Sequence, residues 1–161
     1  MGAAARGHIG RMFAIGSRRR GPRQRALRNI RHGRVQRSLA LVTAASALPL
    51  GLEIYLEHFK GSFGDKWMWT PIALSPPLTA AGLAGYWSER AARTWLPAIS
   101  ALYALDGLIG VYTHIRGVQK RPGGLREPTY NLVMGPPLLA PGSLAMVGGI
   151  GLAAPLFRRE R

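Results

Sequence analysis

The chain has 161 residues, a net charge of +15, 47% hydrophobic residues and no cysteine. The lack of cysteine excludes disulfides, thiolate metal sites and thiol nucleophiles. Charge and apolar residues occupy different parts of the chain, which argues against a soluble basic domain and predicts an all-α integral membrane protein.

Residues 1–38 form a basic arm with 11 arginines and no acidic residue. Arginine beside a first apolar helix marks the cytoplasmic side and attracts anionic lipid headgroups, so we predict a cytoplasmic arm that is flexible or lies on the membrane surface. Nucleic-acid binding is the less favoured alternative. The arm also resembles an organelle transit peptide, but 19 arginines against 3 lysines, with abundant Ala and Gly, favour a bacterial chain from a GC-rich genome.

Residues 39–161 are expected to form a four-helix membrane domain. Four apolar blocks, each about long enough to cross ~30 Å of hydrocarbon as a helix, predict transmembrane spans at residues 39–58, 67–87, 94–114 and 130–157. The first block could instead be a signal peptide with Ala45-Ser46-Ala47 as its cleavage site. We favour a span because the apolar run continues to Tyr55.

The basic residues predict which side each link faces. The arm, the link at 88–93 and the tail at 158–161 hold 16 of the basic residues, and the other two links hold 6. Both termini are therefore expected in the cytoplasm of a multi-pass inner-membrane protein. Aromatic residues flank the blocks as interface anchors would: Tyr55, Trp67, Trp69, Tyr112 and Tyr130 on the outer side, and Tyr86, Trp87 and Trp95 on the inner side.

Two pairs of matching segments recur in the same order. GLEIYLEHFKG at 51–61 matches GLIGVYTHIRG at 107–117, and PPLTAAG at 76–82 matches PPLLAPG at 136–142. This order predicts two tandem helical hairpins related as a parallel internal repeat.

The prolines and glycines of the second and fourth blocks carry packing expectations. The prolines should kink these two helices, and the small residues should let helices approach closely. The prolines are Pro71, Pro76, Pro77, Pro136, Pro137 and Pro141, and the small residues are Ala80, Gly82, Gly85, Gly142, Gly148 and Gly151. Gly148-Gly149-Ile150-Gly151 is interpreted as a packing surface and not a phosphate loop, because it lacks the strand and lysine that such a loop needs.

Ionisable residues in or beside the spans are the candidate functional groups. His58 and His114 occupy equivalent places in the repeat, so they could ligate haem b between them. A metal shared with Glu53 and Glu57 is a weaker alternative. The structural alternative is that each histidine hydrogen-bonds water, carbonyls or lipid phosphate at the interface.

Asp106 lies deeper, about 12 Å below His114 at 1.5 Å per residue, and its repeat counterpart is Leu50. It could relay protons or balance a charge. We favour an interhelical hydrogen bond to Tyr103, Thr43 or Ser46, with Glu53 satisfied in a similar way or reaching the outer interface.

Three functions follow, and none is a soluble-type enzyme, because the sequence shows no nucleophile–base arrangement. The first is an accessory or anchor subunit of a larger membrane complex, with a membrane-protein partner or a second copy of itself. The second is an electron-transfer subunit with bis-His haem b. The third is a small proton-coupled transporter that acts as an oligomer and uses Glu53 or Asp106.

Overall fold

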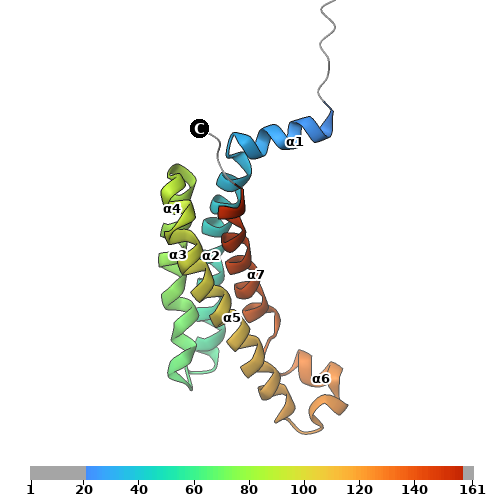
Figure 1. The fold of residues 1–161 in the computed structure, drawn as a ribbon. Coiled ribbons are helices and arrows are strands. Elements are labelled where there is room, and N and C mark those ends of the chain that lie inside the picture. The colour runs from blue at the N-terminus through green and yellow to red at the C-terminus, as the bar shows by residue number, and fades with distance from the viewer. Residues whose placement is uncertain (1–20, 158–161) are drawn as a thin grey trace, which may run out of the picture.

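The computed structural model describes residues 21–157, and this part of the chain consists of helices joined by short loops, without strands. Four long helices lie side by side in alternating directions (Figure 1). They are α2 (Arg34–Lys60), α3 (Thr70–Trp87), α5 (Trp95–Gln119) and α7 (Leu139–Ala153). The shorter elements are α1 (Pro22–Arg31), η1 (Lys66–Trp69), α4 (Glu89–Arg93), η2 (Gly124–Arg126), α6 (Pro128–Val133) and η3 (Ala154–Leu156). We name the two ends of the bundle the α1 end and the α6 end.

Three helical segments are long and apolar enough to cross a membrane: Arg34–Lys60, Glu89–Gln119 and Leu139–Leu156. This is consistent with a multi-pass membrane protein. Helix α3 covers most of the expected second span, 67–87, but is not among the three. The crossing of α3, and with it the total of four spans, stays a prediction.

The most extensive helix contacts join α2 to α3 and α5 to α7, as two hairpins would. A Cβ atom at Gly82 would lie 2.7 Å from the carbonyl oxygen of Ala40, and one at Gly148 would lie 2.6 Å from the backbone nitrogen of Ala104. Glycine is therefore required at both positions. Gly142 was also expected to let two helices approach closely. A Cβ at Gly142 would have no atom within 4 Å, so this prediction was wrong.

The fourth apolar block, 130–157, is not one helix. Helix α6 ends at Val133, residues 134–138 are irregular, and α7 begins at Leu139. Pro136 and Pro137 lack amide donors and disfavour a helical residue before them, so they interrupt the helix here instead of kinking it. By contrast, Pro76 and Pro77 lie inside α3, as expected.

The described part of the basic arm is mostly helical. Residues 1–20 lie outside the described residues, as do the tail arginines at 158, 159 and 161. Pro22–Arg31 forms helix α1, and Gly33, in the left-handed conformation with φ 67°, joins it to α2. A glycine reaches this conformation without a steric penalty. Helix α1 consequently turns away from the bundle and lies crosswise to its axis (Figure 1).

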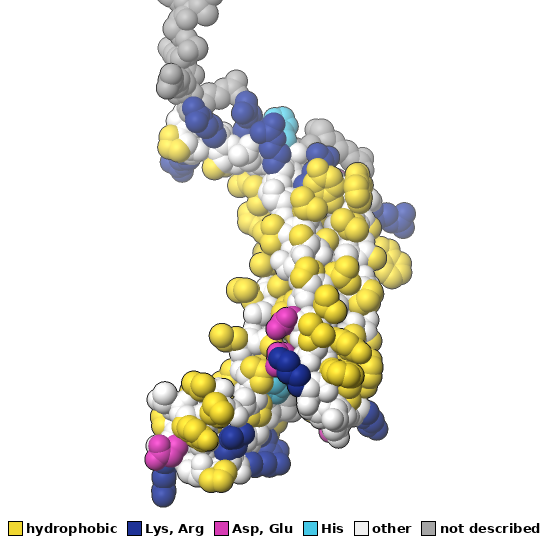
Figure 2. Space-filling view, turned by 180° about the vertical axis from the view of Figure 1, so that it is seen from behind, with side chains coloured by type: hydrophobic (Ala, Val, Ile, Leu, Met, Phe, Trp, Pro, Cys, Tyr) yellow, Lys and Arg dark blue, Asp and Glu magenta, His cyan; other side chains and the backbone are white. Residues whose placement is uncertain are grey.

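The core of the bundle combines several alanines with a few large side chains, and many other large apolar residues are exposed on its outside. Ala40, Ala47, Leu78, Tyr103 and Leu144 belong to the core, whereas a broad set of leucines on α2 and α5 is exposed. Figure 2 shows hydrophobic side chains over the body of the bundle and Lys and Arg gathered mainly toward its ends. This distribution suits a bundle whose surface contacts lipid.

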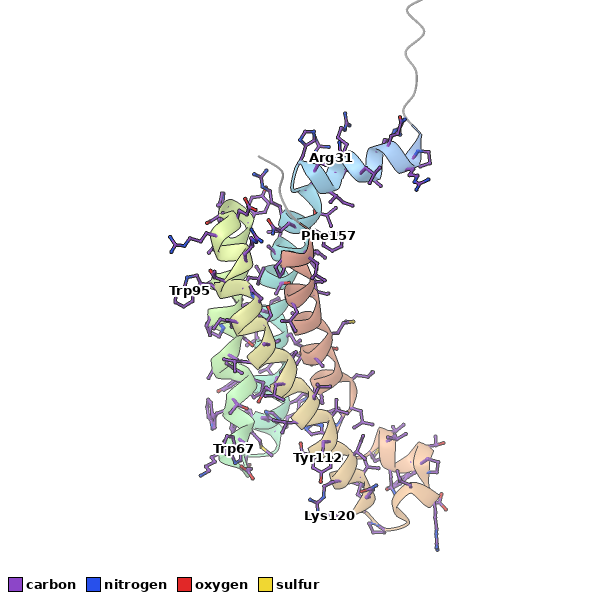
Figure 3. The ribbon with its side chains drawn as sticks, viewed as in Figure 1. Arg31, Trp67, Trp95, Tyr112, Lys120 and Phe157 are labelled. Atoms are coloured by element: carbon purple, nitrogen blue, oxygen red, sulfur yellow. The ribbon has the colours of Figure 1, made fainter. Side chains whose placement is uncertain are left out.

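Labelled side chains mark the two ends. Arg31, Trp95 and Phe157 lie toward the α1 end, and Trp67, Tyr112 and Lys120 lie toward the α6 end (Figure 3). Trp67 is 69% exposed and Trp95 is 68% exposed. Aromatic and basic side chains in these places are typical of helices that end at a membrane–water interface.

Candidate functional site at the α6 end

His58 connects the end of α2 to the start of α3. Its Nδ1 lies 3.1 Å from the carbonyl oxygen of Met68 in η1. Because a carbonyl only accepts, Nδ1 carries the proton and donates. This contact closes the α2–α3 hairpin. In the neutral ring it leaves Nε2 without a proton, so that Nε2 can accept a hydrogen bond or bind a metal.

His114 makes the corresponding contact in the other hairpin. Its Nδ1 donates to the carbonyl oxygen of Pro137 over 2.6 Å. Each carbonyl belongs to the residue two positions before the returning helix of its hairpin. Met68 precedes Thr70, the first residue of α3, and Pro137 precedes Leu139, the first residue of α7. The repeated histidine therefore has the same structural partner in both hairpins.

Asp106 bonds to a residue that the sequence analysis did not name. Its Oδ1 lies 2.5 Å from the hydroxyl of Thr70, which joins α5 to α3. Two of the three expected partners are engaged elsewhere: the Tyr103 hydroxyl contacts the Ser75 hydroxyl at 3.1 Å, and Thr43 donates to the Leu39 carbonyl of its own helix. The expectation of an interhelical hydrogen bond was right, but its partner was not foreseen.

The polar groups at this end influence one another. His58 interacts electrostatically with Asp106, His114 and Glu57, and all four side chains are half-buried. Glu57 pairs with Lys60 on α2 at 2.5 Å. The α6 end thus collects ionisable residues from both hairpins, which the sequence alone could only suggest.

A metal centre gains no support here. Within residues 21–157, no three His, Asp or Glu side chains are grouped so that they could hold a metal ion. Glu53 is exposed on α2, and Glu57 is engaged with Lys60. The weaker alternative built on Glu53, Glu57, His58 and His114 is therefore not carried further, whereas Nε2 of each histidine is still a candidate haem ligand.

The sequence analysis missed an aromatic cluster in the loop between α2 and α3. The rings of Phe63 and Trp69 stack with centroids 4.2 Å apart, and Tyr55 lies 5.6 Å from Phe63. Phe63 has a positive φ of 46°, an uncommon conformation for a bulky residue, which the ring contacts help to hold. The signal was a phenylalanine in the short segment GSFGD, between two glycines that favour a turn.

Neither a protein-family model, nor a curated protein, nor a solved structure matches this chain.

Proposed function

We propose that this chain is a multi-pass accessory or anchor subunit of a larger complex in the bacterial inner membrane. The observation that carries the proposal is the use of its polar side chains. His58, His114 and Asp106 each bond to a group that joins two helical elements of the bundle. These bonds hold the scaffold together, as a structural subunit requires.

The proposal includes four spans with both termini in the cytoplasm. Helices α2 and α5 run in the same direction and both begin at the α1 end (Figure 1). The chain therefore has to return to that end between them, and α3 is the segment that makes the return. A crossing α3 places α1 and residue Phe157 on one side, where the arginines of α1 and α4 would face anionic lipid.

A projecting segment at the α6 end supplies the proposed partner surface. Residues 124–134, comprising η2, α6 and Met134, project from the bundle in Figure 1 and expose Val133 (74%), Tyr130 (61%) and Met134 (58%). The segment is folded, because the Asn131 side-chain amide donates to the carbonyls of Pro122 and Gly124 at 3.0 and 2.8 Å. We call residues 124–134 the α6 platform.

The apolar composition of the platform favours a membrane-protein partner. Its exposed side chains include aliphatic and aromatic residues, and Arg126 and Glu127 are the charged residues within it. Aromatic and methionine side chains are enriched at protein interfaces. Its position beside Tyr112 and Lys120 at the end of α5 puts it at interface depth, where another membrane subunit could contact it (Figure 3).

The test is the mass of the assembly that carries the protein. Tagged protein would be extracted from its native membranes in mild detergent and sized on a native gel, with Tyr130→Ser/Val133→Ser as the variant. The matched control is Leu105→Ser/Leu108→Ser, whose leucines on α5 are 55% and 60% exposed.

We expect the wild type and the control to migrate in a complex larger than the chain itself, and the platform variant to be released from it. Co-expression with a second tag separates a homo-oligomer from a complex with another protein. A wild-type chain that migrates alone would contradict the proposal, and so would a platform variant that stays in the complex.

A second candidate is bis-His haem b ligation, and the matched histidine contacts favour it. A ligating histidine commonly donates its other ring N–H to a backbone carbonyl, which fixes the tautomer and the orientation of the ring. Both His58 and His114 make such a bond through Nδ1. Nε2 of each ring is then the nitrogen with the lone pair.

The reduced-minus-oxidised visible spectrum tests this candidate. Protein expressed with haem supplied would be compared with the His58→Ala/His114→Ala variant and with Glu53→Gln as a control for substitution on α2. A haem band that the His variant alone loses would identify an electron-transfer subunit. A wild type without a haem band would show that the two histidines do not ligate haem and have only a structural role.

A further inference from the structure

The hydroxyl of Thr70 lies within hydrogen-bond distance of two acceptors. The carbonyl oxygen of Trp67 lies 2.8 Å away and Oδ1 of Asp106 lies 2.5 Å away. A threonine hydroxyl has one proton and two lone pairs, so it donates only one hydrogen bond at a time. Both contacts form together only if one of the two partners supplies a proton.

Asp106 is the partner that can supply it. A carbonyl has no proton, whereas a protonated carboxyl donates one O–H. With Asp106 neutral, its O–H donates to Thr70 Oγ1, and the Thr70 hydroxyl then donates to the Trp67 carbonyl. The chain of donors is complete only in this form, and the short Asp106–Thr70 distance is within the range for O–H···O bonds.

The surroundings of Asp106 favour the same form. The ion pairs within residues 21–157 engage Glu57 and Glu89, and Asp106 is not one of their partners. Helix α7, packed along α5, has no ionisable side chain, and in α3 the ionisable residue is Tyr86, near the α1 end. An unpaired carboxylate inside a membrane is costly, whereas a neutral acid that donates a hydrogen bond is tolerated.

The ionisable groups that act on Asp106 are few. His58 on α2 interacts with it electrostatically, and Tyr103, one turn away on α5, does so as well. His114 lies two turns further along α5 and acts on His58. Since the Tyr103 hydroxyl is held by Ser75, His58 is the group on a neighbouring helix whose charge bears on the acid.

We propose that Asp106 is a proton-binding site within the membrane, with its neutral carboxyl donating to Thr70 and so joining α5 to α3. The site takes up a proton from water and no other ligand. Its occupancy decides whether Thr70 can keep both hydrogen bonds at once, since with an ionised Asp106 the single Thr70 proton reaches only one of the two acceptors. This inference does not depend on the accessory role proposed above.

Infrared spectroscopy of the full chain in lipid vesicles tests the site at neutral pH. A protonated carboxylic acid has a C=O stretching band that a carboxylate lacks. We expect this band in the wild type and its loss in Asp106→Asn, which keeps the shape and a donor toward Thr70. Glu53→Gln, which alters another carboxyl on a spanning helix, is the control and should keep the band.

Thr70→Val supplies a second, independent readout. It removes the acceptor without removing the acid, so the C=O band should persist and shift to higher frequency as its hydrogen bond is lost. If Asp106→Asn does not fold, the shift of the C=O band in Thr70→Val still tests the proposal. A wild type without the band at neutral pH overturns the proposal, as does a band that survives in folded Asp106→Asn.

Discussion

His58 and His114 lie 56 residues apart in the chain and donate the same hydrogen bond, each from Nδ1 to the carbonyl oxygen of the residue two positions before a returning helix. This relationship explains why the pattern around each histidine recurs. A carbonyl just before a returning helix lies outside the hydrogen bonds of that helix, and the imidazole of the outgoing helix donates to it. The imidazole connects these two parts of each hairpin.

Replacing His58 with alanine should weaken the α2–α3 hairpin without preventing insertion. The hydrogen bond to Met68 is lost, at a cost of about 1 kcal/mol, whereas insertion depends on apolar length and the distribution of arginine. The thermal unfolding midpoint in detergent and the amount of protein in the membrane fraction measure the two effects.

Asparagine at position 58 is the matched control, because its side-chain NH₂ occupies a place close to the histidine Nδ1. His58→Asn should recover most of the stability, and His58→Gln, whose amide extends further, should recover less. Equal loss in all three variants, or failure of His58→Ala to insert, would contradict this account.

Two adjacent glycines of α7 should respond in opposite ways to alanine. A Cβ at Gly148 would lie 2.6 Å from the Ala104 backbone nitrogen and 2.7 Å from the Ser100 carbonyl oxygen, so Gly148→Ala should separate α5 from α7 and cost about 1–3 kcal/mol. Gly149 has nothing within 4 Å of such a Cβ. Gly149→Ala should therefore be neutral or stabilising, by up to about 1 kcal/mol.

Unfolding of the two variants in the same detergent compares them directly. The difference between neighbouring positions on one helix removes the contribution of helix propensity, which is the same for both. Similar stability of the two variants would show that α5 and α7 do not pack as closely as described.

Helix α1 should lie on a membrane surface that contains anionic lipid. It has four arginines, and Leu27 is 51% exposed on the side opposite Arg25, since two helical positions differ by about 200°. The chain has no cysteine, so a single Leu27→Cys or Arg25→Cys carries a fluorophore at one known place. Quenching by lipids that are spin-labelled near the headgroup reports depth.

In vesicles with anionic lipid, the label at position 27 should be quenched more strongly than the label at position 25. In purely zwitterionic vesicles the difference should shrink, because the arginines lose their attraction to the surface. Equal quenching at both positions in both lipids would show that α1 does not lie in the interface.

Gln36 on α2 offers a gain in stability. Its side chain is fully buried, and within residues 21–157 its amide nitrogen and oxygen have no hydrogen-bond partner. A buried polar group without a partner costs about 1–3 kcal/mol, so Gln36→Leu should raise the unfolding midpoint. Gln36→Glu should lower it, because a charge would replace the amide; a fall with leucine as well would reveal a partner for Gln36.

Much of the fold could be predicted from local pattern. Apolar runs of span length predicted helices α2 and α5 within about five residues of their observed limits, because a backbone in lipid has to satisfy its own hydrogen bonds. The fourth run was predicted less well, since α7 begins at Leu139 and not at residue 130. The recurrence of His58 and His114 predicted a shared role, and the structure identifies equivalent contacts. Arginine distribution predicted a topology that no observation here has tested.

Only the tertiary structure showed how the two proline motifs differ and which residue bonds to Asp106. The PPL motifs match in sequence, yet Pro76 and Pro77 lie inside α3, while Pro136 and Pro137 lie in the break before α7. The partner of Asp106 could not be read from the chain, since Thr70 is 36 residues away and on another helix. A sequence determines which segments are apolar and long enough to form helices in a membrane, but only the packed arrangement of helices brings a given carboxyl to a given hydroxyl.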